Sequence, residues 1–315
     1  MINLTKQNAS IVVIEEEQVG QRIDNYLQTK LKGVPKSHVY RIIRKGEVRV
    51  NKGRIQASYR LCLNDNVRIP PLQLKPAAPI KSPPAQQTRN LAERILYEDK
   101  NLLIVNKPSG MAVHGGSGIS FGVIETFRSM YPQWRYLELV HRLDRDTSGC
   151  LMLAKKPSIL KEIHELLRVG NINKTYIALV NGIWPEDLTE VDVALQKSQL
   201  SSGERMVKVT EEGKASVTRF RLLEEFSNTS LIQASPKTGR THQIRVHTAY
   251  KNHPIAGDDK YGNKDFNRNM RELGCKRLFL HAVELSFKLV SQDQVIKIRA
   301  ELDEDLEATL AGLRT

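Results

Sequence analysis

The sequence predicts an α+β protein with two domains of unequal size, joined by a proline-rich linker. Its 315 residues exceed the roughly 100–200 residues of a single domain. Six of the 13 prolines fall between Pro70 and Pro84, and such a stretch favours an extended segment that packs weakly. Strand-like and helix-like segments are mixed after residue 90, which is typical of one larger folded domain.

The expected boundaries follow from this division of the chain. We assign residues 1–70 to a small N-terminal α/β domain with its core at about residues 20–70, residues 71–89 to the linker, and residues 90–315 to the larger domain. In the larger domain we expect strands at Leu102–Val105, Tyr176–Val180 and Leu231–Ala234, and helices at about residues 159–168 and 241–250.

Composition excludes several classes of protein. Apolar residues make up 40% of the chain, but no uncharged apolar run approaches the roughly 20 residues of a membrane-spanning helix. The N-terminus lacks the hydrophobic stretch of a secretory signal. The three cysteines, Cys62, Cys150 and Cys275, are widely spaced, which favours a reducing compartment over a disulfide framework. We therefore expect a soluble cytoplasmic protein.

The positive charge of the chain is concentrated near its N-terminus. The whole sequence carries a formal charge of +13. Twelve basic and three acidic residues lie between Gly20 and Pro70, a net charge of +9, which leaves +4 for all the rest of the chain. The basic surplus therefore belongs to one module and not to the protein as a whole.

This basic module has the pattern of two helices followed by a hairpin. Apolar residues recur at helical spacing from Ile23 to Leu31, and Ser37 is suited to cap a second helix. Gly46 is expected to end that helix. The alternation in residues 48–50 then leads into a turn at 51–53, which indicates a hairpin.

Within the second helix, basic and apolar residues are predicted to lie on different faces. Val39, Ile42 and Ile43 form the apolar stripe, and cations occupy positions 41, 44 and 45. A cationic face on a compact unit is expected for docking on phosphates, although charge runs are more often simply solvated. The candidate RNA-binding residues are Lys36, Arg41, Arg44, Lys45, Arg49, Lys52 and Arg54.

A dense polar run in the larger domain contains the candidate catalytic carboxylate. The run extends from His141 to Gly149 and is followed by the apolar segment Cys150–Ala154. A polar loop that leads into a buried strand is a common position for catalytic residues. Asp144 is flanked by Arg142 and Arg145, and neighbouring cations favour the ionised form needed for a nucleophile or base. Taken alone, the string Asp-Thr-Ser-Gly is equally typical of a structural turn.

Several strings together resemble known families. GQRIDNYL, SHVYRIIRKGEVRVNKGRI and DNVRIP resemble the αL-type RNA-binding domain, in which the second helix and the following turn face RNA. ILYEDKNLLIVNKPSGMAVHGG, LVHRLDRDTSG, PKTGRTHQIRVH, GDDKYG and RLFLHA resemble, in order, the RluA-type pseudouridine synthases over about residues 90–310. The likeness implies the pseudouridine synthase fold, a mixed and largely antiparallel sheet flanked by helices and loops.

The resemblance also implies roles for individual residues. Asp144 matches the catalytic carboxylate, which acts either as a nucleophile on the ribose or as the trigger for bond cleavage. Arg245 matches the buried arginine that holds this carboxylate in place. Tyr176 matches a tyrosine that packs against the flipped base and is proposed to move a proton. Leu280 matches an apolar residue near the base, and Arg142 an arginine that contacts RNA around the space left by the uridine. The target base must leave its stack to be reached.

The resemblance further implies an isomerase that acts on uridines in 23S ribosomal RNA or a large-subunit assembly precursor. It implies no metal, no cofactor, no membrane and no obligatory protein partner, and we expect a monomer. Two other functions stay open from the residues alone: a non-enzymatic RNA-binding or ribosome-assembly factor, and an N-glycosidase that releases uracil. We interpret Asp258 and Asp259 as turn residues, and His114, His141 and His281 as structural hydrogen-bonding groups.

Overall fold

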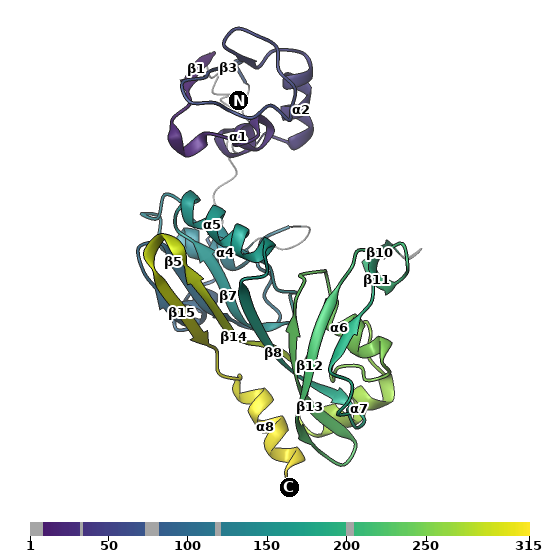
Figure 1. Cartoon of the computed structure of the whole chain (residues 1–315). Helices are drawn as coiled ribbons and strands as arrows, with labels where there is room; N and C mark the ends of the chain where they lie inside the picture. The colour runs from purple at the N-terminus through teal and green to yellow at the C-terminus, as the bar shows by residue number, and fades with distance from the viewer. Residues whose placement is uncertain (1–8, 32–33, 73–81, 117–120, 200–204) are drawn as a thin grey trace, which may run out of the picture. The chain divides into compact units, whose positions relative to one another are not determined.

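The computed structural model describes residues 9–31, 34–72, 82–116, 121–199 and 205–315. Figure 1 traces the chain through two compact units, Met1–Ser82 and Pro83–Thr315. We call them the N-terminal unit and the catalytic unit and describe each by itself.

The N-terminal unit is built from two helices and a three-stranded antiparallel sheet in the order β1-β3-β2. Its buried residues form one apolar cluster, to which both helices contribute. Its elements are β1 (Ser10–Val13), η1 (Glu16–Gln18), α1 (Ile23–Lys30), α2 (Lys36–Arg44), β2 (Arg49–Val50) and β3 (Asn66–Ile69).

Helix α2 has the two faces that the sequence predicts, but it begins differently. Val39, Ile42 and Ile43 are buried, and the helix ends before Gly46, whose φ is +71°. The predicted cap at Ser37 is wrong, because α2 starts at Lys36 and no side chain caps it. Pro35 precedes the first turn instead, and its ring presets the backbone there.

The predicted hairpin after α2 is also wrong in its pairing. The turn is present, with Asn51 and Lys52 in the left-handed region, but beyond it only an isolated bridge joins Val50 to Gly53. The partner of β2 is β3, with Arg49 opposite Arg68. Strand pairing was decided here by the tertiary structure and not by the adjacent turn.

The catalytic unit is organised around a mixed sheet of ten strands. The main path runs β4-β5-β7-β14-β8-β13-β12-β9, with β6 paired to β7 and β15 paired to β14. Among the strand pairs that the structure describes, only β7 and β14 run parallel. The strands are β4 (Ile95–Glu98), β5 (Leu102–Lys107), β6 (Glu138–Leu139), β7 (Ser148–Ala154), β8 (Ile172–Asn181), β9 (Glu190–Asp192), β12 (Val217–Glu225), β13 (Thr229–Pro236), β14 (Leu280–Leu289) and β15 (Gln294–Arg299).

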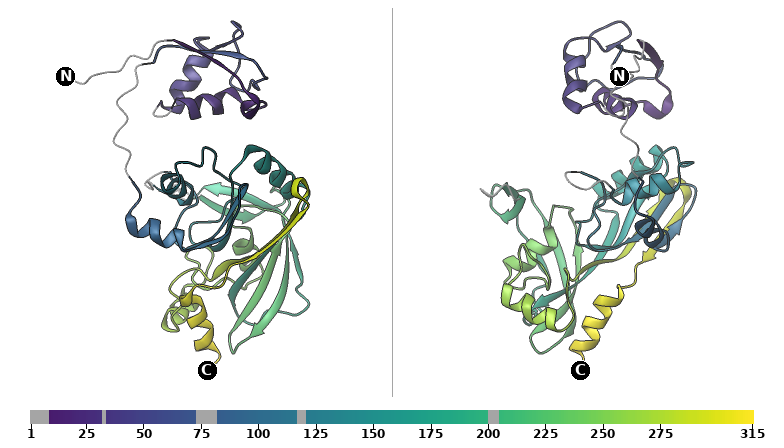
Figure 2. Two further views of the ribbon diagram at one scale, coloured as in Figure 1. Left: turned by 90° about the vertical axis from the view of Figure 1, so that its left-hand side faces the viewer. Right: turned by 180° about the vertical axis from the view of Figure 1, so that it is seen from behind.

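Helices cover this sheet, and a separate hairpin of β10 and β11 extends from it (Figure 1). Figure 2 shows the same unit from the side and from behind, with α8 at one end of the sheet. The remaining elements are α3 (Ala85–Ala92), α4 (Val123–Met130), α5 (Pro157–Arg168), β10 (Leu195–Gln199), β11 (Arg205–Val209), α6 (Gln243–Tyr250), α7 (Lys264–Glu272), η2 (Val290–Gln292) and α8 (Glu304–Leu313).

The two faces of β5 and β7 pack against different helices. Leu103 and Val105 belong to the same apolar cluster as Phe127 of α4. Ile104, which points to the other face, clusters with Ile163 of α5. Successive side chains of a strand alternate between faces, and both faces are covered here, so the segment reads as an unbroken apolar run.

The parallel β7–β14 pair positions the polar loop that precedes β7. His281 lies opposite Ser148 and Ala282 opposite Gly149. Gly149 has φ +106°, and a Cβ atom on it would lie 2.3 Å from the carbonyl oxygen of Ala282. Only glycine fits where the two strands approach so closely. The loop containing Asp144 is therefore anchored at its end by backbone packing.

The expected linker, residues 71–89, overlaps two different parts of the chain. Residues 73–81 lie outside the described residues. Residues 85–89 belong to α3, and Gln87 donates a hydrogen bond to Thr126 of α4 at 2.9 Å. Among the helices that the structure describes, none is long and apolar enough to cross a membrane.

Candidate active site

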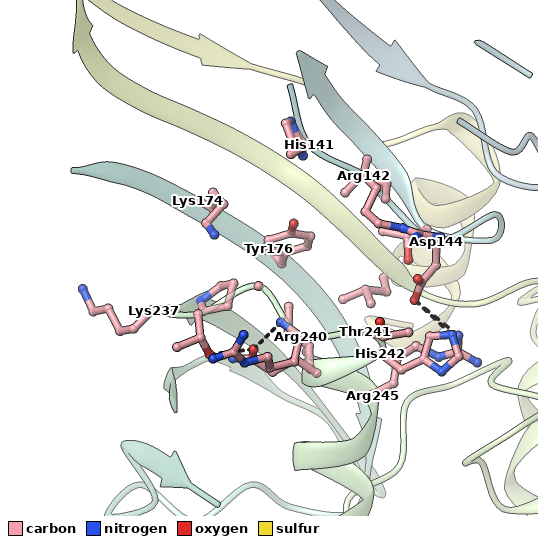
Figure 3. Close-up of a pocket in the computed structure, with 18 of the residues that line it drawn as sticks. His141, Arg142, Asp144, Lys174, Tyr176, Lys237, Arg240, Thr241, His242 and Arg245 are labelled. Atoms are coloured by element: carbon pink, nitrogen blue, oxygen red, sulfur yellow. Dashed lines mark hydrogen bonds and ion pairs between the residues drawn. The ribbon is translucent and has the colours of Figure 1, made fainter. Parts of the chain in front are cut away.

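A cavity of about 350 Å³ lies where β8, β14 and the start of α6 meet the loop before β7. Figure 3 shows its polar side chains. Asp144 and Arg142 come from the loop, Tyr176 from β8, Leu280 from the start of β14, and Arg245 from α6. The structure thus brings together all five residues that the sequence assigns to catalysis and substrate binding.

Asp144 faces Arg245 at a distance that leaves the arginine mainly engaged elsewhere. Arg245 Nη1 lies 3.5 Å from Asp144 Oδ2. The same guanidinium donates from Nε and Nη2 to the two carboxylate oxygens of Asp258, both at 2.7 Å. The positive charge of Arg245 is therefore shared between two carboxylates, and Asp144 has the longer contact.

Asp258 is a buried structural partner that sequence reasoning placed only in a turn. Its side chain is fully buried. Its Oδ1 also accepts from the backbone amides of Lys260 and Tyr261, so the turn interpretation is correct but incomplete. Burial opposes ionisation of Asp258, but Arg245 and these amides outweigh it and lower the pKa of its carboxyl. The GDDKYG string was the available signal.

The arginines beside Asp144 in sequence are not its ion-pair partners. Arg145 pairs instead with Asp146 at 2.9 Å, on the exposed side of the loop. Arg142 is exposed at the rim of the cavity. The expectation that these two arginines are the cations that hold Asp144 is corrected: the arginine that contacts it is Arg245, which is 101 residues away in the chain.

Tyr176 and Leu280 form the apolar side of the cavity. Tyr176 is half-buried and projects from β8 into the space between the loop that carries Asp144 and the segment that carries Arg240 (Figure 3). Burial and the nearby Asp144 raise the pKa of the Tyr176 hydroxyl, so it stays protonated near neutral pH. Leu280 is buried opposite Ala178 of β8. This arrangement offers a flat base one aromatic ring and one aliphatic surface.

A buried lysine holds the catalytic loop in place. The side chain of Lys107, at the end of β5, is fully buried. Its ammonium donates to the carbonyl oxygens of Pro108, Met111 and Arg145 at 2.8, 2.8 and 2.9 Å. Burial lowers the pKa of Lys107 to about 7, against the attraction of Asp146 and Asp144. Lys107 therefore ties the 108–111 turn to the backbone one residue beyond Asp144.

The turn before α6 is fixed by one buried amide. Gln243 Oε1 accepts from Thr238 Oγ1 at 2.7 Å and from the Arg240 backbone amide at 2.9 Å. Its Nε2 donates to the Val217 carbonyl oxygen at 3.0 Å. The GRTHQIR string thus builds one wall of the cavity, and the exposed Arg240 is among the residues that line it (Figure 3).

The histidines predicted to be structural make hydrogen bonds within the fold, His281 in the core and His114 at the surface. His141 accepts from the Met152 amide at 3.1 Å, and burial lowers its pKa to about 4. His281 lies 2.8 Å from Ser148 Oγ and 3.0 Å from the Ala300 carbonyl oxygen. His114 Nδ1 lies 2.9 Å from the Gly115 carbonyl oxygen. Within the described residues, no cluster of three or more His, Cys, Asp or Glu side chains could hold a metal ion.

The candidate RNA-binding cations of the N-terminal unit all lie at the surface. Contacts within the unit include those of Arg49, whose Nε donates to the Gly46 carbonyl oxygen at 3.2 Å, of Lys45, 4.0 Å from Glu47, and of Arg41, whose Nη2 lies 3.2 Å from His38 Nε2. The exposed residues are Lys36, Arg41, Arg44, Lys45, Arg49, Lys52 and Arg54. They are displayed to solvent by α2 and by the turn that follows it.

Comparison with known proteins places this fold among enzymes that isomerise uridine in RNA. A family model described as RNA pseudouridylate synthase matches residues 101–250, and an S4 domain model matches residues 21–67. The chain belongs to the RNA pseudouridylate synthase family. This membership confirms the family and the fold that the sequence predicts.

Relatives match along nearly the whole chain. The chain is 54% identical to ribosomal large subunit pseudouridine synthase C of Haemophilus influenzae, over 99% of each chain. It is 53% identical to the Escherichia coli protein of the same name, over 98% of this chain and 97% of that one. Among solved structures, human RNA pseudouridylate synthase domain containing 4 is similar with a TM-score of 0.59 and 25% identity. That match covers 73% of this chain and 96% of the human one.

Sequence reasoning missed three residues at or near the cavity. Lys107 lies in the first motif string, His242 in the third and Asp258 in the fourth. Lys107 and His242 were assigned no role, and Asp258 was assigned only to a turn. Lys107 lies within an apolar strand segment, where a lone lysine is unusual and signals a buried partner. His242 is considered further below.

Proposed function

We propose that this protein converts uridines of 23S ribosomal RNA to pseudouridine, in the free RNA or in a large-subunit assembly precursor. Support comes from the relatives named as ribosomal large subunit pseudouridine synthase C, which match over nearly the full length. We propose that it acts in the cytoplasm, where its substrate is made, as a monomer and without an obligatory protein partner.

We propose that the N-terminal unit holds the RNA while the catalytic unit reacts with it. The expected division into residues 1–70, 71–89 and 90–315 belongs to this proposal. In support, the N-terminal unit presents α2 cations on the face opposite its apolar stripe. Such cations bind phosphates by releasing counterions, which strengthens binding without reading sequence.

Asp144 is the proposed catalytic carboxylate. The reaction breaks the bond between ribose C1′ and uracil N1, forms a bond between C1′ and C5, and moves one proton from C5 to N1. A carboxylate starts this either by attacking C1′ or by removing a ribose proton, and both routes require it ionised. Arg245 lies 3.5 Å from Asp144, while its shorter contacts with Asp258 leave the Asp144 carboxylate free to react.

The remaining roles concern the base and its neighbours. We assign Tyr176 and Leu280 to the two sides of the flipped uracil, with the protonated Tyr176 hydroxyl able to donate a proton. We assign Arg142 to the RNA around the emptied stack, consistent with its exposed position at the rim. Base flipping explains why the protein needs a cavity, since both N1 and C5 of the uracil are inaccessible while the base is stacked in RNA.

One observation supports this function most directly. A carboxylate, an arginine and a tyrosine from three separate elements line one cavity of about 350 Å³, within the range of about 300–1,000 Å³ that encloses small ligands. The cavity combines an ionised group with apolar walls, as the separation of a sugar from its base requires.

The test maps pseudouridines in ribosomal RNA from cells with and without the gene. We expect specific 23S sites to lose modification and to regain it with the wild-type gene but not with Asp144→Asn. Asp146→Asn is the matched control, because Asp146 lies in the same loop but pairs with Arg145 at the surface; it should restore modification. Unchanged 23S sites would refute the proposed substrate, and release of free uracil by the purified protein would favour an N-glycosidase.

A further inference from the structure

His242 is a polar residue of the cavity that the roles above leave unused. It precedes the first turn of α6 with φ +54° and ψ +20°, in the left-handed region. Residues other than glycine seldom adopt this conformation, and such strain is concentrated at functional sites. The strained backbone directs the ring between two groups: Nδ1 lies 2.7 Å from the Tyr261 hydroxyl, and Nε2 lies 3.8 Å from Asp144 Oδ2.

The hydrogen bonds of Tyr261 determine which ring nitrogen carries the proton. The Tyr261 hydroxyl accepts from the backbone amide of Val207 at 2.9 Å, so its own proton is free to be donated. Among the described residues, the His242 ring is its only acceptor within hydrogen-bonding distance. Because Nδ1 accepts this proton, the neutral imidazole carries its own hydrogen on Nε2. That N–H group faces Asp144.

The charges around His242 favour the neutral ring. Asp144 approaches from the loop before β7, Arg245 from α6 itself, and Asp258, Lys260 and Tyr261 from the loop after it. Burial lowers the pKa of His242 despite the attraction of Asp144, and Arg245 and Lys260 lower it further. The donated Tyr261 proton occupies the site that a second ring proton would need.

We propose that Tyr261 and His242 form a positioning pair that presents a neutral N–H group to Asp144. This inference rests on the catalytic role proposed for Asp144. A neutral donor orients the carboxylate without adding a second full positive charge beside Arg245, which would make Asp144 a weaker nucleophile or base. The 3.8 Å separation is longer than a hydrogen bond, and such contacts commonly tighten only when substrate is bound.

The arrangement also connects this pair to the β10–β11 hairpin. Val207 of β11 packs in one apolar cluster with Val246 of α6, and Tyr261 packs against that cluster. The Arg245 guanidinium lies 5.2 Å from the centre of the Tyr261 ring. Replacing Tyr261 with phenylalanine keeps the ring and these packing contacts and removes the hydroxyl, together with its hydrogen bonds to His242 and to the Val207 amide. This makes Tyr261→Phe a selective probe.

The experiment measures kcat and KM across pH for the full-length protein on an RNA substrate. In Tyr261→Phe the ring loses its fixed tautomer and gains a proton more readily, so we expect the acid limb of kcat to move up by roughly one pH unit. We expect kcat at the optimum to fall about tenfold, the effect of one lost hydrogen bond in the transition state, with little change in KM. Tyr250→Phe is the control, because Tyr250 is a half-exposed tyrosine at the end of α6 and is not among the residues that line the cavity.

Two variants of His242 separate positioning from packing. Gln keeps an N–H group near the position of Nε2 and cannot titrate, so His242→Gln should stay within about threefold of wild type at the optimum. His242→Ala should lose about tenfold or more. Equal activity of the two variants would overturn the proposal, as would a Tyr261→Phe profile that coincides with that of Tyr250→Phe.

Asp144→Asn separates a failure of the catalytic role proposed for Asp144 from a failure of the positioning pair. If it retained turnover, the catalytic assignment of Asp144 would fail whatever His242 does. If it is inactive while Tyr261→Phe behaves as wild type, only the positioning pair is refuted.

Discussion

The N-terminal unit and the catalytic cavity use positive charge in opposite ways. The cations of α2 and its following turn are exposed, and they are displayed around a separate apolar core. Arg245 at the cavity and Lys107 behind the loop that carries Asp144 are buried, and each is hydrogen-bonded to specific oxygens. One region holds charges that water already stabilises, and the other holds charges that only the protein stabilises.

This difference predicts how each region responds to mutation. The electrostatic interactions of an exposed charge are screened by water and salt. Removing such a charge therefore changes stability or binding only slightly. A buried charge is balanced by named groups at fixed distances, so its loss leaves a partner unpaired in a low-dielectric site. The same substitution should therefore be mild in one unit and severe in the other.

The largest expected effect comes from Asp258→Asn. It leaves Arg245 buried without its bidentate partner, which should lower the free energy of unfolding by about 3–5 kcal/mol. It should also reduce kcat about tenfold or more, because the guanidinium is no longer held in place. Asp259→Asn is the neighbouring control: its partner, Arg271, is exposed, as is Asp259 itself, so the unfolding midpoint in urea should not change.

The Asp258 effect should depend on pH. The folded-state pKa of Asp258 is below the ordinary value of 3.8. Its contribution to stability is therefore present above that value and is lost as the pH falls through the folded-state pKa. Urea unfolding at about pH 7 and about pH 3 should show a smaller difference between wild type and variant in acid. If the stability difference between wild type and Asp258→Asn were larger in acid, the ion pair assigned to Asp258 and Arg245 would be contradicted.

The next effect is that of Lys107→Met. Three carbonyl oxygens lose their donor, and we expect unfolding to become easier by about 2–3 kcal/mol, with a lower kcat because the loop next to Asp144 loosens. Lys100→Met, an exposed lysine just before the same strand, is the control. Equal stability of the two variants in urea would show that the buried ammonium does not hold the loop.

A moderate effect on RNA binding is expected from replacing Arg41, Arg44 and Lys45 together with glutamine. The slope of log Kd against log salt concentration should fall by about 2, at about 0.7 for each lost contact with single-stranded RNA. The control changes the same net charge on the catalytic unit, at Arg168, Arg268 and Lys288, which pair with acidic neighbours. If both triple variants reduced the slope equally, binding would depend on net charge and not on this face.

The smallest effect is predicted for Lys52→Gln, in the turn after α2. One exposed cation should weaken RNA binding by less than about threefold and leave unfolding unchanged. Compared with Lys107→Met, it tests the contrast between the regions with one lysine from each. A loss of stability as large as that of Lys107→Met would remove the distinction.

Much of the N-terminal unit could be read directly from the sequence. Helical periodicity, which is local, predicts the apolar stripe at Val39, Ile42 and Ile43. It also predicts the separate stripe of cations at positions 41, 44 and 45. The pairing of β2 with β3 could not be predicted, because Asn66–Ile69 lies beyond a long loop. Its register depends on contacts such as Asp65 with Asn51, which no local pattern reveals.

The cavity shows the same limit more clearly. The motif strings identified Asp144, Tyr176 and Arg245, and the structure brings them into one cavity. Position in the chain pointed to Arg142 and Arg145 as cations beside Asp144, whereas the family resemblance pointed to Arg245, and it is Arg245 that contacts Asp144. Residues adjacent in a loop point in different directions, whereas Arg245 reaches Asp144 across the fold.

The sequence by itself determined the division of charge, the helical faces of the basic module and the chemical types that serve the reaction. The division of charge and the helical faces follow from composition and from periodicities of a few residues, and the chemical types follow from the motif strings and the family that they resemble. Only the tertiary structure decided which charges compensate one another: Arg245 with Asp258, Lys107 with three carbonyl oxygens, and His242 with Tyr261 beside Asp144. The physical reason is that Coulomb and hydrogen-bond energies depend on distance and burial, which folding sets between residues far apart in the chain.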